Sequence, residues 1–383
     1  MKEGWKYKKL GEICRVINGR AYSKDEMLNQ GKYRLLRVGN FFTNDSWYYS
    51  DLELEEDKYC DNGDLLYAWS ASFGPRIWDG EKVIYHYHIW KMVCSEEIDK
   101  HFLCYWLDSD ELKKQTMTSL HGATMAHITK RIIENAIVSY PPLSEQQSIV
   151  DYLDSAFAKI DAMKANAEKA LNEAKALFQA SLKEMLEPKE GWEEKTLKEI
   201  SVISGNYGLS VPSTEYNGVR YLRITDITEW GELNDEKVSA KVDNENEQEL
   251  LEEGDILFAR TGATVGKTLM YKEDFGKCLF AGYLIRYRLN KKLVLPKYMF
   301  YITHSSNYYK WIIENQKAAA QPNISAKLYN EYIVSFPSIL EQQTIVEALD
   351  SLKSKVDHLQ ENFDKISKEC DALKQAILRQ VFE

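Results

Sequence analysis

The sequence lacks the features that would assign it to a common class of enzyme, membrane protein or metalloprotein. It has no run of 18 apolar residues, no apolar segment after Met1, no G-x-G-x-x-G or P-loop fingerprint and no H-E-x-x-H motif. Its six cysteines lie far apart without a C-x-x-C pair, so we expect free buried thiols rather than zinc ligands or a redox couple. These absences predict a soluble cytoplasmic protein that binds no metal or cofactor itself and is not an enzyme.

Length and composition predict an ordered protein with more than one core. The chain has 383 residues, 44% of them hydrophobic and 12% aromatic, and no low-complexity tract. Single hydrophobic cores stop growing at about 250 to 300 residues. We therefore expect two domains.

An internal repeat gives the boundaries of these domains. Four motifs of the first half return in the second half in the same order, namely Gly4–Ile13 as Gly191–Ile200, Leu36–Val38 as Leu222–Ile224, Gly63–Ala68 as Gly254–Ala259, and Leu143–Asp154 as Ile339–Asp350. A chain with two such copies is built to do one kind of thing at two places.

Each copy ends in a heptad pattern without glycine or proline, which predicts a helix of about 43 residues. We expect Ser144 to cap the first helix, with Gln147 completing a capping box, and Pro188 to end it. Short connections to the intervening domain predict that the two helices lie antiparallel. The predicted seam is rich in alanine in the first helix and contains Leu153, Ile160, Leu177, Leu352, Leu359, Phe363, Ile366 and Leu373.

The resulting fold class is α+β, with two similar mixed α/β domains joined by two long helices in an antiparallel coiled coil and a pseudo-twofold internal repeat. Predicted strands include Tyr33–Val38, Asp64–Ala68 and Val83–Ile89, and a helical piece lies near residues 101–115. The predicted segments are residues 1–143, helix 144–187, residues 188–338 and helix 339–383.

The charge is segregated along the chain. The net charge of −10 argues against a nucleic-acid partner, but seven acids fall within residues 51–64 and seven more within residues 243–255. The remainder of each domain is mildly basic and could face phosphates. A solvated acidic loop without bearing on partners is an equally good interpretation.

Two pairs of polar stretches suit a polymer with phosphates and base edges. Small residues allow a close approach of the backbone, hydroxyls suit phosphates, Arg or Lys can read guanine, and Gln or Asn can read adenine. We interpret both stretches of each copy as DNA-contacting loops, with plain structural turns as the alternative; the candidate residues are Trp69, Ser70, Ser72, Arg76, Gly122, Thr124, Arg260, Thr261, Thr264, Lys267, Gln321 and Asn323. His86 and His88 share one face of a predicted strand, where packing is favoured over metal binding.

The whole chain resembles the specificity subunit of type I restriction-modification systems. The resemblance rests on motifs that occur in both copies, namely Gly63–Leu66 with Trp69-Ser70, Gly254–Leu257 with Arg260–Gly262, the Gln321–Ser325 stretch, and the paired Glu-Gln-Gln-x-Ile-Val helix starts. The first domain departs from it, because His121–Thr124 is followed by Met125-Ala126-His127 and not by a Gln-Pro-Asn run.

This resemblance implies two target recognition domains that each read one half of a bipartite, asymmetric target in double-stranded DNA. It implies as partners two adenine-N6 methyltransferase subunits carrying S-adenosylmethionine, and restriction-translocase subunits that use ATP and Mg²⁺. The residues alone leave a second class open, a coiled-coil adaptor whose two domains bind proteins. A stand-alone enzyme is disfavoured by the missing catalytic motifs.

Overall fold

The computed structural model describes residues 2–43, 45–70, 72–117, 128–241, 249–316 and 322–383. Contacts between residues divide the chain into two compact units. The first is Met1–Glu168 with Phe363–Glu383, and the second is Lys169–Asn362. Each unit therefore holds one α/β domain together with parts of both long helices.

The first domain consists of small sheets and short helices that precede the first long helix. Strand β2 begins a four-stranded sheet of order β2-β9-β6-β7, a second sheet has the order β4-β3-β8-β5, and β1 pairs with β10. The elements are β1 (Lys6–Lys9), α1 (Leu10–Ile13), β2 (Cys14–Asn18), β3 (Tyr33–Leu36), α2 (Val38–Phe42), β4 (Tyr48–Ser50), β5 (Tyr59–Cys60), β6 (Leu65–Ser70), β7 (Ser72–Ile77), β8 (Val83–Tyr85), β9 (Ile89–Cys94), α3 (Lys100–Asp108), α4 (Asp110–Met117), α5 (Lys130–Glu134) and β10 (Ile137–Tyr140).

The second domain repeats this topology in its four-stranded sheet and its terminal strand pair, but two two-stranded sheets, β14-β18 and β13-β15, stand in place of the second four-stranded sheet. Its four-stranded sheet has the order β12-β19-β16-β17, β11 pairs with β20, and β14 lies parallel to β18 as β3 lies parallel to β8. The elements are β11 (Glu193–Thr196), β12 (Ser201–Tyr207), β13 (Ser213–Thr214), β14 (Arg220–Leu222), β15 (Ser239–Ala240), β16 (Ile256–Ala259), β17 (Thr268–Met270), β18 (Cys278–Phe280), β19 (Leu284–Leu289), α7 (Pro296–Ile302), α8 (Ser306–Asn315), α9 (Ala326–Asn330) and β20 (Ile333–Phe336).

The repeated Gly-Asp motif forms the turn that leads into the central strand of each four-stranded sheet. Gly254 has a φ of +90°, which favours glycine, and the Asp255 carboxylate accepts from the Glu252 N–H at 2.9 Å. The same carboxylate accepts from the Arg288 guanidinium on the neighbouring strand at 2.7 Å, and this contact raises the pKa of Arg288. Equivalent groups close the turn in the first domain, namely Gly63, Asp61, Asp64 and Lys91.

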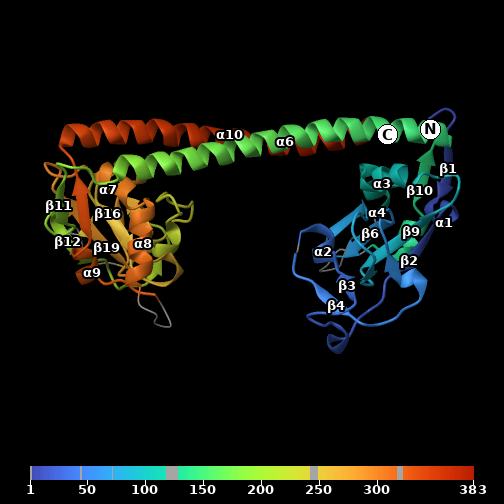
Figure 1. The fold of residues 1–383 in the computed structure, drawn as a ribbon, viewed down its shortest axis with the longest axis horizontal. Coiled ribbons are helices and arrows are strands. Elements are labelled where there is room, and N and C mark those ends of the chain that lie inside the picture. The colour runs from blue at the N-terminus through green and yellow to red at the C-terminus, as the bar shows by residue number, and fades with distance from the viewer. Residues whose placement is uncertain (1, 44, 71, 118–127, 242–248, 317–321) are drawn as a thin grey trace. The chain divides into compact units, whose positions relative to one another are not determined.

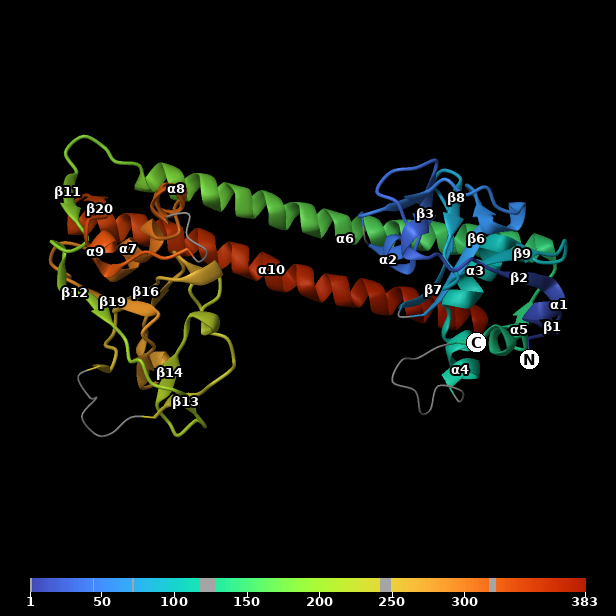
Figure 2. The ribbon, with the colours of Figure 1, turned by 90° about the horizontal axis from the view of Figure 1, so that it is seen from below.

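The two long helices are α6 (Leu143–Leu186) and α10 (Ile339–Phe382), of 44 residues each. In the first unit the Lys374 ammonium lies 2.6 Å from the Asp161 carboxylate. In the second unit the Lys175 ammonium donates to the Gln360 side chain at 2.8 Å. The helices therefore run antiparallel and side by side within both units (Figures 1 and 2). The predicted fold class is confirmed.

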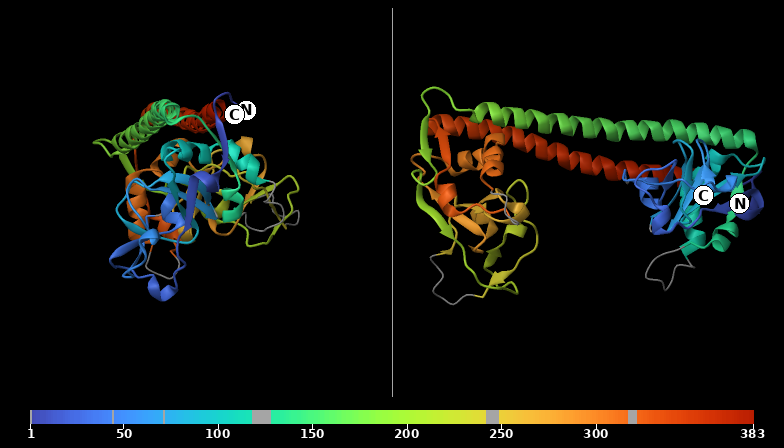
Figure 3. Two further views of the ribbon diagram at one scale, coloured as in Figure 1. Left: turned by 90° about the vertical axis from the view of Figure 1, so that its right-hand side faces the viewer. Right: turned by 60° about the horizontal axis from the view of Figure 1, so that its bottom comes forward.

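Each long helix begins in the core of its own domain and ends in the core of the other unit. Leu153 of α6 and Phe382 of α10 belong to one buried cluster with the first domain. Phe178 of α6 and Leu349 of α10 belong to the corresponding cluster with the second domain. In the second unit both helices lie on one side of the domain (Figure 3).

The heptad seam of the first helix differs from the prediction. Leu153 and Ile160 are buried as expected, but Leu177 is 60% exposed and Phe178 is buried in its place. The alternate seam positions of α6 lie one residue later than predicted, at Phe157, Lys164, Leu171 and Phe178. Phe157 and Leu171 thus lie in the seam one residue after the predicted Ala156 and Ala170, because burying a phenylalanine or leucine removes more apolar area from water, while the predicted Ala167 and Ala174 stay half-buried.

The second helix follows its predicted seam over most of its length. Leu352, Leu359, Phe363 and Ile366 are half-buried, whereas the predicted seam residue Leu373 is 47% exposed. Beyond Cys370 the buried positions shift to Leu378 and Phe382, which contact the first domain's core. The change of partner from helix to domain explains the change of register.

The predicted capping box at the first helix is wrong. The helix begins at Leu143, so Ser144 lies inside its first turn, and the Gln147 side chain donates to Asp151 at 2.9 Å. The neighbouring Gln146 takes the structural role instead. Its side chain is fully buried and donates to the Glu97 and Pro141 carbonyls at 3.0 and 2.8 Å.

The second helix repeats this contact with Gln342. Its amide donates to the carbonyls of Leu293 at 2.8 Å and Pro337 at 2.9 Å, and its carbonyl accepts from the Leu295 N–H at 2.9 Å. In the first copy the Gln146 carbonyl accepts from the Asp99 N–H at 2.8 Å. Each glutamine thus ties the first turn of a long helix to the loop before α3 or α7.

A tyrosine and an aspartate form a second repeated attachment. The Tyr105 hydroxyl of α3 donates to Asp154 of α6, and the Tyr301 hydroxyl of α7 donates to Asp350 of α10. Burial, followed by this hydrogen bond, raises the pKa of both tyrosines. Each domain is therefore fastened to its own helix at two points.

Replacing Gln342 by Leu should destabilise the second domain. The change leaves the Leu295 N–H and the Leu293 and Pro337 carbonyls without the Gln342 side chain. Each buried polar group left unpaired costs about 1–3 kcal/mol, so we expect the free energy of unfolding to fall by roughly 3 kcal/mol or more. Urea denaturation of the variant measures it. Gln343→Leu at the exposed neighbouring position is the matched control, and equal losses in the two variants would contradict the role given to Gln342.

Candidate nucleic-acid interface

In the second domain the two predicted loop stretches lie against one another. The backbone of Thr261 forms an isolated antiparallel bridge with that of Asn323. The Ile324 N–H donates to the Arg260 carbonyl at 2.9 Å, and the Gly262 N–H donates to the Pro322 carbonyl at 3.0 Å. Segments about 60 residues apart in the sequence therefore form one surface, which we call the 260/323 surface (Arg260–Thr264 with Pro322–Ser325).

Local hydrogen bonds hold the 260/323 surface in shape. Gly262 has a φ of +69° and opens a short 3-10 turn through Thr264, whose hydroxyl donates to the Thr261 carbonyl at 3.0 Å. Ser325 caps helix α9, because its side chain accepts from the Leu328 N–H. Asn323 is exposed on this surface, while Thr261 and Thr264 are half-buried.

Arg260 is the cation of this surface. Its guanidinium lies 4.9 Å from the ring centre of Tyr207 at the end of β12, and its Nε is buried without a hydrogen-bond partner. Within the described part of the second domain it is the one arginine whose side chain has no carboxylate or carbonyl partner. The other four arginines pair inside the domain, namely Arg220, Arg223, Arg286 and Arg288.

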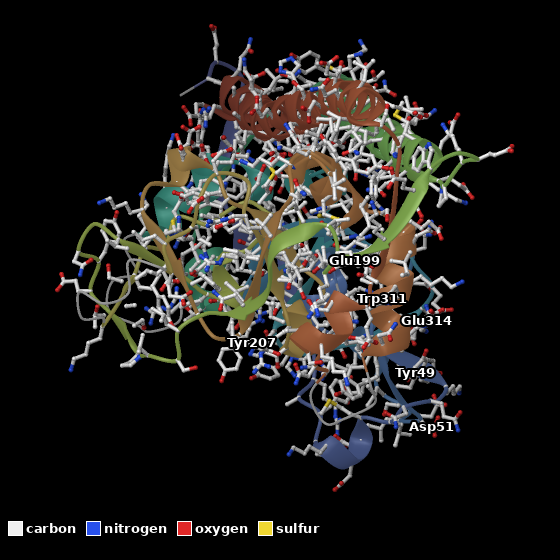
Figure 4. The ribbon with its side chains drawn as sticks, turned by 90° about the vertical axis from the view of Figure 1, so that its left-hand side faces the viewer. Tyr49, Asp51, Glu199, Tyr207, Trp311 and Glu314 are labelled. Atoms are coloured by element: carbon white, nitrogen blue, oxygen red, sulfur yellow. The ribbon has the colours of Figure 1, made fainter. Side chains whose placement is uncertain are left out.

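Exposed tyrosines lie beside Arg260. Tyr207 is 40% exposed, and Figure 4 places it at the other end of its strand from Glu199. Tyr283 is 57% exposed, and its carbonyl accepts from the Arg260 N–H at 3.1 Å. An arginine whose guanidinium lies over an aromatic ring and has no hydrogen-bond partner can bind a base edge or a phosphate.

Lys267, the other predicted cation, is already paired. Its ammonium lies 2.6 Å from the Glu229 carboxylate, and its side chain is 19% exposed. It follows the 3-10 turn and lies next to β17, not at the bridge that joins Thr261 to Asn323. The structure therefore brings Arg260 and Asn323 together but directs Lys267 to an ion pair within the domain.

In the first domain the predicted loop at 69–76 is a tight hairpin between β6 and β7. Trp69 pairs with Phe73 and Ser70 pairs with Ser72 in the strand register, so the expectation of a loop is wrong. Ser70 is buried and Ser72 is exposed. The period-two alternation of a strand was hidden by small residues and a proline.

Arg76 is engaged within the first domain. Its guanidinium donates to the Phe41 carbonyl and to the Asp79 carboxylate, both at 2.9 Å, and it lies over the Trp78 ring. The remaining predicted site residues, Gly122, Thr124 and Gln321, lie outside the described residues.

In the first domain, Trp69 and a turn that contains Tyr87 and His88 lie where the second domain has Arg260. Trp69 stacks on Trp90 at 5.5 Å, meets the His88 ring edge-on at 5.1 Å, and donates from Nε1 to the Tyr87 carbonyl at 2.8 Å. The strand predicted over Val83–Ile89 is in fact two strands with a turn at residues 86–88. Among the described residues no group of three His, Cys, Asp or Glu side chains could hold a metal ion.

Burial shapes the chemistry of this turn. It lowers the pKa of His86 to about 4, with His88 and Arg37 adding to the effect, so His86 is neutral at physiological pH. The turn therefore offers aromatic rings and the neutral imidazole of His86, whereas the second domain offers a guanidinium. Three tyrosines of these surfaces are not among the predicted site residues, namely Tyr207, Tyr283 and Tyr87. Aligning the two copies of the sequence around this turn would have indicated them.

The acidic stretches are ion-paired within their own domains. In the first domain Lys32, Lys82 and Lys91 pair with acids of residues 51–64. In the second, Arg286 and Arg288 pair with acids of residues 249–255. Much of the negative charge is therefore neutralised locally, which weakens the objection from net charge.

Comparison with known proteins agrees with the repeat. A family model described as the type I restriction modification DNA specificity domain matches residues 2–173 and again residues 189–367. The chain is 24% identical to the type I restriction enzyme EcoBI specificity subunit of Escherichia coli over 99% of this chain and 86% of that protein. It is 26% identical to the MjaVIII specificity subunit of Methanocaldococcus jannaschii over 96% of this chain and 90% of that protein.

Solved structures share the fold. A chain from a study of complex assembly and conformational transition of the type I R-M system matches with a TM-score of 0.75 at 20% identity, covering 100% of this chain and 98% of that one. The HsdS subunit from Thermoanaerobacter tengcongensis matches with a TM-score of 0.55 at 20% identity, covering 100% of this chain and 97% of that one. With two copies of the family's domain that together span most of its length, the chain belongs to the type I restriction-modification DNA specificity family.

Proposed function

We propose that the chain recognises a bipartite, asymmetric sequence in double-stranded DNA, with one half-site read by each domain. Its family is that of the non-catalytic specificity subunits of type I restriction-modification systems. The finer assignment of half-sites to domains is supported by the two copies of the family's domain.

The observation that carries this proposal is the 260/323 surface. It combines a guanidinium that has no hydrogen-bond partner among the described residues, an exposed amide and an exposed aromatic ring on one continuous patch. Arg bidentate to guanine and Asn bidentate to adenine are the common pairings of major-groove readout.

The difference between the domains supports two unlike half-sites. The Trp69 N–H donates to the His88 carbonyl, and the Arg260 N–H donates to the Tyr283 carbonyl, both at 3.1 Å. These positions are therefore equivalent in the repeat, yet one carries an indole and the other a guanidinium. Different side chains on the same backbone favour different base sequences.

We further propose that α6 and α10 set the gap between the half-sites. Each helix is continuous over 44 residues, and the pair is held by buried seam residues in both units. A stiff helical pair is suited to holding two reading surfaces at a fixed spacing, since the rise per residue is constant.

The proposed partners are two adenine-N6 methyltransferase subunits, which would carry S-adenosylmethionine, and restriction-translocase subunits, which would carry ATP and Mg²⁺. The relatives named above are specificity subunits of restriction enzymes, and the matched structural study concerns assembly of such a complex. Among the described residues no helix is long and apolar enough to cross a membrane. We place the chain in the cytoplasm, where DNA is accessible.

Binding of a duplex by this chain with its methyltransferase should weaken steeply as salt rises. Each neutralised phosphate releases a counterion, so the logarithm of the binding constant should fall linearly with the logarithm of salt concentration. A gel-shift titration at several salt concentrations measures the slope. Salt-independent binding, or no binding of any duplex, would favour the protein adaptor.

The isolated chain, incubated with labelled S-adenosylmethionine and DNA, should transfer no methyl groups.

Arg260→Ala should weaken binding to the target by about 1–3 kcal/mol and relax specificity at one position of one half-site. The reason is that Arg260 is the cation of the 260/323 surface with no partner inside the described protein. Lys267→Ala is the matched control; since Lys267 pairs with Glu229, we expect a smaller loss that is uniform across sequences. Binding constants for duplexes substituted at each position decide it, and an unchanged profile for Arg260→Ala with intact folding would refute the contact.

Lengthening both helices should widen the gap without changing the half-sites. Seven residues added to each helix, near Ala167 and Phe363, keep the heptad seam and extend the pair by roughly 10 Å. At about 3.4 Å per base pair this predicts a gap longer by one to three base pairs, with some twist absorbed by the DNA. Methylome sequencing of a host that carries the variant measures the gap between the two methylated half-sites. An active variant with the original gap would show that the helices do not set it, and lengthening only one helix should destabilise the protein.

A further inference from the structure

We infer that Tyr207 is a positioning residue for Arg260 and that the two together commit the second half-site to a guanine contact. The inference rests on the proposed function and adds to it the identity of one base and of the residue that prepares the protein to read it.

Tyr207 joins the three segments that meet at the 260/323 surface. It is the last residue of β12, its hydroxyl accepts from the Ala326 N–H at 2.9 Å, and its ring lies 4.9 Å from the Arg260 guanidinium. Ala326 begins helix α9, three residues after Asn323. One side chain therefore contacts both the predicted guanine reader and the start of the helix that follows the predicted adenine reader.

The position of Arg260 over the ring determines which of its N–H groups remain available to donate to a base. The Arg260 Nε is buried and has no hydrogen-bond partner, so the side chain is held by the ring and not by an acceptor. The remaining donors are the two terminal NH₂ groups, a planar fork that matches O6 and N7 of guanine. A stacked fork has lost most of its rotational freedom before binding, so less entropy is lost when the base is bound.

The strand that carries Tyr207 is distorted in a way that the first domain's strand is not. The pairing of β12 with β19 shifts register twice, between Ser201 and Ile203 and between Ile203 and Asn206, and Gly205 has a φ of +71°. The pairing of β2 with β9 runs from Cys14 to Asn18 without a shift. Bulges of this kind re-aim side chains next to functional sites.

The fold itself does not require a tyrosine here. Asn18 pairs with Trp90 in the first domain, and Tyr207 pairs with Ile285 in the second, at equivalent positions of the sheet. The first domain thus forms the same strands with Asn18 and Trp69 where the second has Tyr207 and Arg260. The tyrosine and the arginine occur together in the second copy, where the guanidinium has no hydrogen-bond partner within the described protein. A residue that positions an arginine for base reading is expected to occur together with that arginine.

The test uses the full chain assembled with its methyltransferase, and a duplex carrying the target identified by methylome sequencing. Competition binding is measured for this duplex and for duplexes substituted singly at each position of both half-sites. The variants are Tyr207→Leu, Tyr207→Phe, Arg260→Ala, Arg260→Lys and the double variant of Tyr207→Leu with Arg260→Ala. Tyr216→Leu is the matched control, since Tyr216 is an exposed tyrosine of the same domain with Lys237 over its ring.

Tyr207→Leu should weaken target binding roughly three- to tenfold, the size of a partly exposed cation–π contact, with the loss of discrimination confined to one guanine. Tyr207→Phe keeps the ring and should restore most of the affinity. Arg260→Lys should weaken discrimination at the same guanine without abolishing it, because lysine can also donate to guanine but lacks the planar fork. In the Arg260→Ala background Tyr207→Leu should cause little further loss, because the tyrosine acts through the arginine.

Several results would overturn the inference. They are a full additional loss for Tyr207→Leu in the Arg260→Ala background, a loss spread evenly over both half-sites, or an Arg260-sensitive position that is not a guanine. If Tyr207→Leu does not fold, as judged by its thermal melt, Tyr207→Asn introduces the residue that the first domain carries and is scored in the same way. Failure of the wild-type complex to bind any duplex specifically would instead refute the proposed function, so the two failures are distinguishable.

Discussion

The buried glutamine at the start of each long helix is the contact on which the arrangement of each unit depends. Gln146 and Gln342 each satisfy two carbonyls and one N–H of loops that would otherwise bury unpaired groups. Two helical turns later, Asp154 and Asp350 receive a tyrosine hydroxyl from α3 or α7. Two attachment points on one rigid helix define a line, so the direction of each long helix is fixed with respect to its own domain.

A fixed direction at the start of a helix has consequences at its end. Phe178 and Leu182 at the end of α6 lie in the second domain's core, and Leu378 and Phe382 at the end of α10 lie in the first domain's core. Neither core is therefore complete with the contiguous sequence of its own domain. The last turn of the chain contributes to the burial of residues as early as Leu10, which couples the stability of the first domain to the integrity of the C-terminal helix.

The sequence predicted what is repeated and local, and missed what depends on three-dimensional neighbours. The repeat and the unbroken heptads predicted two like domains and two long antiparallel helices. Heptad spacing could not decide between Leu177 and Phe178, since both fit an alternation of three and four, and only the opposite helix and domain settle the choice. In the same way nothing in the sequence indicated that Thr261 lies beside Asn323, or that Glu229 occupies Lys267.

Duplication explains how such a site can diverge without cost to the fold. The backbone hydrogen bonds at Trp69 and Arg260 are the same, so backbone groups hold both strand ends whichever side chain is present. The side chains at these positions are free to differ, provided that each finds support, and each does so from an aromatic ring: Trp90 under Trp69, and Tyr207 under Arg260. The side chains that differ between the copies are thereby separated from the backbone contacts that hold the fold. The buried glutamines hold the scaffold in both copies, while the side chains at the strand ends differ between the copies, as the proposed reading of two unlike half-sites requires.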